Sequence, residues 1–169
     1  MSAPIAVDRR PQWWSVIGYE VSMLRGLQEL EGFRIIQPTK DPVRSGWLLK
    51  NNIIEGRVLH TRNLCDFCTS KQTRDITPSD LFDDFNTDPK YDTLKKLTKH
   101  LTQQYGKNVP GNPRWAFNKM LAHPTKERDS DFNYDPFLER VVPVLQEIIG
   151  EMETLRGLPF PALPEITPT

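Results

Sequence analysis

A polar stretch from His60 to Asp66 carries the residue types in this sequence that are best suited to chemistry. A histidine exchanges protons near neutral pH, and an arginine fork holds an anionic oxygen pair. Periodicity places the stretch late in a long helix, where His60 and Asn63 lie one turn apart on a face that is otherwise apolar. Arg62 and Asp66 are four residues apart on the neighbouring face and can pair with each other.

A second polar group follows a short predicted helix much later in the chain, from His123 to Arg128. Polar side chains on an apolar helix face need hydrogen-bonding partners. We expect the first group, around His60 and Asn63, to find them in this second group. The contact would form either a catalytic site or a hydrogen-bonded core network that ties the two parts of the chain together.

Metal binding is a weaker alternative for the same region. Cys65 and Cys68 form a C-x-x-C pair, and His60, His100 or His123 could complete a tetrahedral zinc site. Both cysteines, however, lie on or near a predicted helix face on which small buried residues are common. The sequence also lacks a glycine-rich phosphate loop, a G-x-S-x-G elbow and an H-E-x-x-H pair. We therefore expect neither a metal nor a cofactor.

The elements that position these groups are marked by one repeated helix-start signature, an oxygen-bearing side chain followed by proline. The five pairs are Asp41–Pro42, Thr77–Pro78, Asp88–Pro89, Asn112–Pro113 and Asp135–Pro136. The oxygen can accept the free N–H groups of the first helical turn, and proline lacks only an N–H that the helix does not use there. The start at Thr77 also resembles a capping box completed by Asp80.

These starts, together with apolar periodicity, predict helices at 13–31, 43–69, 78–85, 89–105, 113–122 and 136–156. The last helix has an apolar seam consisting of Leu138, Val141, Leu145, Ile148, Met152 and Leu155. We assign this seam to the core rather than to a dimer interface, and we expect Pro143 to kink the helix. The only β-like run is 33–36.

The predicted fold class is therefore all-α, a bundle of four main helices with short accessory helices. We expect one domain over residues 11–157, after a loose arm at 1–10. A proline-rich tail at 158–169 would lie extended along the bundle through Phe160 and Leu163, or be disordered.

The composition indicates how large a core the chain can bury and in which compartment we expect it. A chain of 169 residues with 37% hydrophobic content can bury one sizeable core. Two cysteines three positions apart do not form a secreted disulfide framework, and no apolar run suits a signal peptide or a membrane span. We expect a cytoplasmic protein without a membrane partner.

The net charge is zero, but the charges are segregated along the chain. Residues 75–92 contain six aspartates against one lysine, whereas residues 95–128 contain eight lysines and arginines against one glutamate. The basic segment is either a nucleic-acid-binding patch or a set of solvated helix faces. We favour the second interpretation, because nucleic-acid-binding domains usually carry net positive charge.

Three short motifs, in this order, resemble those of a set of uncharacterised bacterial helical-bundle proteins similar to the HEPN superfamily. They are Arg62-Asn63-Leu64 followed by Asp66-Phe67, the segment from Thr77 to Phe82, and Leu121-Ala122-His123-x-Thr125-x-x-Arg128. The HEPN class includes metal-independent RNases of toxin–antitoxin and phage-defence systems, as well as non-catalytic binding modules. Its RNase motif requires a histidine shortly after the arginine, but this sequence has Phe67, Cys68 and Thr69 there.

The resemblance implies a role for each candidate residue. Arg62 would hold the scissile phosphate, and His60 or His123 would act as general acid or base at the ribose 2′-hydroxyl. Asn63 and Arg128 would orient the substrate. HEPN-type sites are often composite across a homodimer.

Two hypotheses follow. The first is a HEPN-like protein that binds or cleaves RNA in a prokaryotic defence or toxin–antitoxin setting. The second is a non-enzymatic helical module that binds a cognate protein partner, in which the polar motifs serve only structure.

Overall fold

The computed structural model describes residues 8–30, 42–121 and 133–161. Within these ranges all regular structure is helical and no strand occurs, which confirms the all-α prediction. The helices are α1 (Arg10–Glu29), α2 (Pro42–Thr69), α3 (Pro78–Leu81), η2, a 3₁₀ turn (Pro89–Tyr91), α4 (Asp92–Tyr105), α5 (Pro113–Leu121) and α6 (Asp135–Arg156). None of them is long and apolar enough to cross a bilayer. The predicted β-like run at 33–36 lies outside the described residues. The same is true of four single residues named above, which are Asp41, His123, Arg128 and Leu163.

Most predicted helix boundaries agree with the structure to within one residue, but α1 begins three residues earlier than the periodicity indicated. Pro11 occupies its first turn, and the Asp8 carboxylate accepts the backbone N–H of Arg10 at 3.0 Å. Asp8 therefore caps the helix from a position within the segment predicted to be a loose arm.

The predicted helix at 78–85 is wrong beyond Leu81. Phe82 has an extended backbone (φ −122°, ψ 127°), and Asp84 has a positive φ of 55°. Leaving the helix allows the Phe82 ring to meet Trp14 of α1 at 5.3 Å and Tyr91 at 5.2 Å between centroids. Burial of a large aromatic side chain thus determines where α3 ends.

The proline-containing starts are capped in different ways. At α3 the Asp80 carboxylate accepts the backbone N–H of Thr77 at 2.8 Å, as a capping box requires. At η2 the Asp88 side chain accepts the N–H of Lys90 at 2.9 Å. At α6 the prediction is wrong, because Asp135 is itself helical and the side chain of Asn133 accepts its N–H at 2.9 Å.

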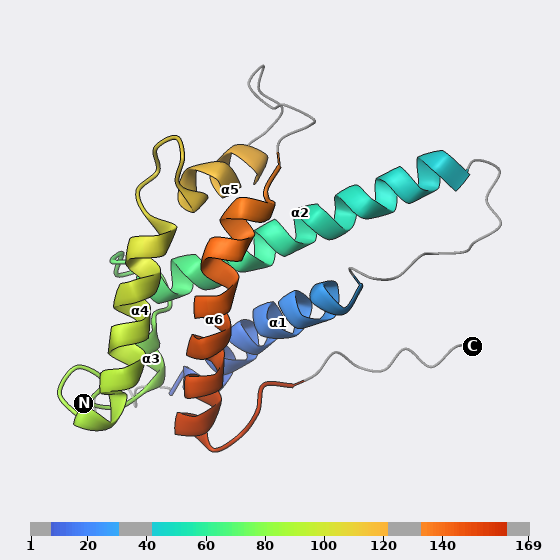
Figure 1. Ribbon diagram of the computed structural model, residues 1–169. Helices are drawn as coiled ribbons and strands as arrows, with labels where there is room; N and C mark the ends of the chain where they lie inside the picture. The colour runs from blue at the N-terminus through green and yellow to red at the C-terminus, as the bar shows by residue number, and fades with distance from the viewer. Residues whose placement is uncertain (1–7, 31–41, 122–132, 162–169) are drawn as a thin grey trace, which may run out of the picture.

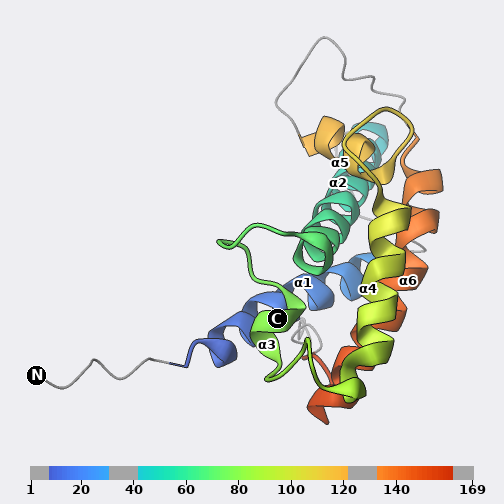
Figure 2. The same ribbon diagram turned by 90° about the vertical axis from the view of Figure 1, so that its left-hand side faces the viewer.

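The long helices form two antiparallel pairs (Figure 1). α1 packs along α2, α4 packs beside α6, and the second pair lies across α2. The short helix α3 lies against α1, whereas α5 packs on α2 (Figure 2). Helix α2 therefore contacts every long helix of the bundle and positions its side chains between them.

The core is built from the predicted apolar faces. In α6 the seam residues Leu138, Val141, Leu145, Ile148 and Met152 are buried, as expected, and Leu155 packs against them. The helix continues through the exposed Pro143. Between α1 and α2 the Leu27 side chain packs directly over Gly56, where an added Cβ would lie 2.9 Å from a methyl carbon of Leu27. The absence of a side chain at Gly56 leaves room for this contact.

The segment after α6 folds back onto the bundle. Gly157 adopts a left-handed conformation (φ 72°) and ends the helix, as the sequence predicted. Phe160 is buried, its ring lies 5.7 Å from that of Trp14, and its backbone N–H donates to Glu153 at 2.7 Å. The predicted contact of Phe160 with the bundle is thus confirmed.

Candidate functional site: two polar clusters on helix α2

The first cluster connects α2 to α1 and is buried. The His60 Nδ1 atom lies 2.7 Å from a carboxylate oxygen of Glu20, and the Asn63 amide donates to the same oxygen at 3.2 Å. The side chains of His60 and Glu20 are only 7% and 15% exposed. We call these three residues the inner cluster.

Among the described residues, Glu20 is the partner of His60 and Asn63, and the second polar motif at 123–128, which we expected to supply one, lies outside these residues. Sequence analysis missed it, although a signal existed. Glu20 lies three residues after Ile17 and four before Leu24, so an acidic side chain stands beside the apolar seam of α1. An acid in that position needs a hydrogen-bonding partner, and His60 and Asn63 of α2 supply it.

The inner cluster holds the His60 ring in a defined orientation. A carboxylate at Nδ1 favours a proton on that nitrogen, which leaves the lone pair of a neutral imidazole on Nε2. The Tyr19 ring packs edge-on at 5.8 Å between centroids. Among the described residues, Nε2 has no hydrogen-bonding partner. The arrangement positions the imidazole as a carboxylate positions a catalytic histidine, but it also satisfies a purely structural need.

The second cluster lies on the side of α2 that faces α4 and α5, and it is centred on Asp66. One oxygen of this carboxylate accepts the Tyr105 hydroxyl at 3.2 Å and an Arg114 N–H at 3.3 Å. Arg114 also donates to the Thr69 hydroxyl at 3.2 Å and stacks over the Tyr105 ring. Burial, followed by the nearby Asp66 charge, raises the pKa of Tyr105 above its usual range, so Tyr105 remains a neutral donor.

Arg62 joins this second cluster, which we call the outer cluster: Arg62, Asp66, Thr69, Tyr105 and Arg114. The Arg62 Nε atom lies 3.5 Å from the second Asp66 oxygen, which confirms the predicted pair. The contact is electrostatic, because Nε makes no hydrogen bond within the described residues. The side chains of Arg62, Asp66 and Arg114 are each about one-third exposed (34%, 39% and 32%).

Two guanidinium groups therefore share one carboxylate, and the outer cluster carries an excess of one positive charge. Each arginine keeps N–H donors that Asp66 does not occupy, because a guanidinium has five. Partly exposed arginine forks with spare donors are suited to hold the oxygen atoms of a phosphate.

The two cysteines belong to neither cluster. Cys65 is fully buried, as are Val58 and Thr61 on the same side of α2, and Cys68 is partly buried. Burial raises the pKa of both thiols, so both are protonated near neutral pH. In the part of the chain that the structure describes, no three His, Cys, Asp or Glu side chains gather as a metal site would require.

The predicted site residues are thus distributed over different places. His60 and Asn63 meet at Glu20, whereas Arg62 contacts Asp66 on another side of α2, because residues two apart on a helix point in nearly opposite directions. His60 and Arg62 of one chain therefore do not share a site. His123 and Arg128 lie outside the described residues, in the segment that follows α5.

Comparisons with protein-family models, curated proteins and solved structures find no match for this chain.

Proposed function

We propose that this chain is a HEPN-like four-helix-bundle protein that binds RNA, and cleaves it without metal, in a prokaryotic defence or toxin–antitoxin setting. The observation that carries the proposal is the convergence of Arg62 and Arg114 on Asp66. It leaves spare guanidinium donors and a net positive charge at a partly exposed site of a chain whose overall net charge is zero.

The phosphate is the part of RNA that this chemistry recognises. Guanidinium forks match the paired oxygens of a phosphodiester, and contacts to phosphate supply most of the sequence-independent affinity for nucleic acids. Arg114 was not among the predicted site residues. It enters the proposal because α5 packs on α2 and brings its guanidinium to the carboxylate that Arg62 also contacts.

The general base must come from another part of the chain than the inner cluster, because His60 lies on the wrong side of α2 to reach a phosphate held by Arg62. We assign the base to His123, which follows α5 in the sequence, and substrate orientation to Arg128. His123 would take the proton of the 2′-hydroxyl, whose oxygen attacks the adjacent phosphorus. The bond to the 5′-oxygen breaks, leaving a cyclic phosphate, and the imidazolium of His123 returns the proton to the leaving oxygen.

The experiment is incubation of the purified protein with labelled single-stranded and structured RNA in EDTA. We expect cleavage by the wild type that is lost in Arg62→Ala and His123→Ala, and RNA binding that is weakened in Arg62→Ala and Arg114→Ala. Arg140→Ala is the matched control, because Arg140 is an exposed arginine of α6 that is hydrogen-bonded only to Gln104 within the described residues. Binding that is equally weakened in all three arginine variants would contradict a specific role of the outer cluster.

A second candidate function, a protein-binding module without catalysis, is favoured by a different observation. Val16 and Tyr19 of α1 and Leu59 of α2 are large apolar residues that are 50%, 56% and 38% exposed. They lie around an inner cluster that already satisfies its own polar groups. If no RNA is bound or cleaved, while Tyr19→Ala abolishes association with a cognate protein partner or with a second copy, this second function is correct.

A further inference from the structure

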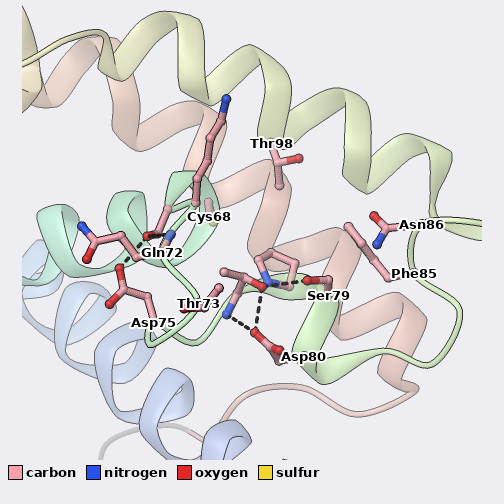
Figure 3. Close-up of a pocket in the computed structure, with 13 residues that line it drawn as sticks. Cys68, Gln72, Thr73, Asp75, Ser79, Asp80, Phe85, Asn86 and Thr98 are labelled. Carbon is pink, nitrogen blue, oxygen red and sulfur yellow. Dashed lines mark hydrogen bonds between the residues drawn. The ribbon is translucent and has the colours of Figure 1, made fainter.

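A hollow of about 460 Å³ lies where the end of α2, the loop after it, α3 and α4 meet (Figure 3). It is separate from both clusters of α2, and no residue of either cluster lines it. Thr98 reaches it from α4, Ser79 and Asp80 from α3, and Phe85 and Asn86 close one end. A hollow of this size accommodates a small ligand, and its walls determine which kind.

The walls carry charges of both signs. The acidic residues Asp75 and Asp80 are among those that line the hollow, together with the exposed Lys71. A ligand with both a cationic and an anionic group therefore complements the hollow better than a simple anion or cation does. Two carboxylates against one ammonium favour a ligand with net positive charge.

Within the described ranges, each of the two carboxylates accepts hydrogen bonds through only one of its oxygen atoms, Oδ2. The Ser70 hydroxyl donates to Oδ2 of Asp75 at 2.5 Å. Both the backbone N–H and the hydroxyl of Thr77 donate to Oδ2 of Asp80 at 2.8 Å. Oδ1 of Asp80 has no partner among the described residues, and Oδ1 of Asp75 has only a 3.8 Å contact with the highly exposed Arg74. One oriented acceptor on each carboxylate thus remains available to a ligand.

The remaining lining suits the body of such a ligand. Phe85 and Pro78 offer apolar surface against which an aliphatic stem can lie. Hydroxyl and amide groups from Ser79, Asn86 and Thr98 surround that surface and can bond the polar groups of the same molecule. An RNA phosphate is disfavoured here, because the two carboxylates would repel it.

We propose that this hollow binds a basic α-amino acid, arginine or lysine. The cationic side chain contacts Asp75 and Asp80, the stem lies on Phe85, and the α-carboxylate contacts Lys71. The same chemistry is present in a free amino acid and in the C-terminal residue of a peptide.

The test is a titration of the full ¹⁵N-labelled protein, followed by amide chemical shifts. The probes are L-arginine, agmatine, which lacks the carboxylate, and a short peptide ending in arginine. We expect shifts at residues lining the hollow with L-arginine below about 10 mM, and at least about threefold weaker binding of agmatine. Binding of L-arginine but not of the peptide identifies the free amino acid as the source, whereas binding of both identifies the peptide terminus as well.

Two variants of lining residues, each with a matched control, test the contact with the cationic group and the contact with the α-carboxylate separately. Asp80→Asn should weaken L-arginine and agmatine alike by about threefold or more. Lys71→Gln should weaken L-arginine only. Asp84→Asn and Lys96→Gln are the matched controls, since both residues are exposed and lie outside the hollow. An absence of shifts up to about 10 mM, equal binding of agmatine and L-arginine, or equal effects of Asp80→Asn and Asp84→Asn would each overturn the proposal.

Discussion

The inner and outer clusters of α2 are each centred on one carboxylate but differ in their access to solvent. The inner cluster joins an imidazole and an amide to one carboxylate, and the side chains of His60 and Glu20 are only 7% and 15% exposed. The outer cluster joins two guanidinium groups to one carboxylate, and about a third of each of these side chains is exposed. The difference in exposure indicates two different roles, which the sequence alone does not distinguish. A covered network stabilises helix packing, whereas an exposed one with spare donors can bind a ligand.

The largest effect on stability should come from Glu20→Ala, because it removes the acceptor shared by His60 and Asn63. Leaving the buried donor of His60 and the partly buried donor of Asn63 unsatisfied should cost about 2–4 kcal/mol of unfolding free energy. The melting temperature should fall by roughly 5–15 °C in a thermal scan followed by circular dichroism. Glu29→Ala, an exposed glutamate of the same helix, should change little. Equal melting temperatures of the two variants would show that the inner cluster does not stabilise the α1–α2 contact.

The outer cluster should respond in the opposite way. Arg62→Ala and Arg114→Ala should each weaken RNA binding by about tenfold, since each removes a fork that holds phosphate. Their melting temperatures should remain close to that of the wild type, because partly exposed ion pairs contribute little to stability. Binding measured against salt concentration should lose about 0.7 from its logarithmic slope for each contact to single-stranded RNA. An unchanged slope would argue against phosphate recognition.

A smaller effect is expected at Tyr105, which connects the outer cluster to the core. Tyr105→Phe keeps the buried ring and removes only the hydroxyl that donates to Asp66 at 3.2 Å. The expected loss is about 0.5–1.5 kcal/mol, measured by urea denaturation. RNA binding should be retained, because Arg62 and Arg114 keep their guanidinium groups. A loss of RNA binding would mean that Tyr105 positions Arg114 as well as stabilising the helix.

The smallest effect on stability is expected at Glu153 of α6. Its side chain is 20% exposed, which is more than that of Glu20 in the inner cluster and less than that of Asp66 in the outer cluster. Its hydrogen bonds to Arg25 and to the N–H of Phe160 lower the pKa of its carboxyl group below the usual value of 4.5. Its stabilising contribution is therefore complete above about pH 4.5 and is lost as pH falls through the lower pKa of the folded state.

The check is a comparison of melting temperatures of wild type and Glu153→Gln between about pH 7 and about pH 3. The wild type should be the more stable protein at neutral pH, and the difference should shrink in acid. A difference that is constant with pH would show that the carboxylate charge has no stabilising role.

The order of helices could be predicted because their starts are encoded locally. A capping oxygen followed by proline determines the beginning of α3 and η2 within a few residues of sequence, and Gly157 determines the end of α6. The end of α3 could not be predicted, since it depends on the distant ring of Trp14, which Phe82 reaches only in an extended conformation.

The candidate site was predicted in part for the same reason. The pair of Arg62 and Asp66 follows from helical spacing alone, and the structure contains it. The spacing of Glu20 beside the apolar residues of α1 signals that it needs a partner, but the partners of Glu20 and Arg114 could not be assigned, because these contacts depend on how α1 and α5 lie on α2. That arrangement is determined by packing, as at Gly56 and Leu27, and not by any local pattern.

The contacts between α1 and the segment after α6 can form only late in synthesis on the ribosome. The Ser22 hydroxyl of the first helix donates to the carbonyl oxygen of Pro161, 139 residues later, and Phe160 buries itself beside Trp14. At about 5–20 residues per second, roughly 7–28 s of synthesis separate these partners. During that interval the surface of α1 around Trp14 and Ser22 has no partner from this segment, so early chains should depend more on chaperones than finished ones.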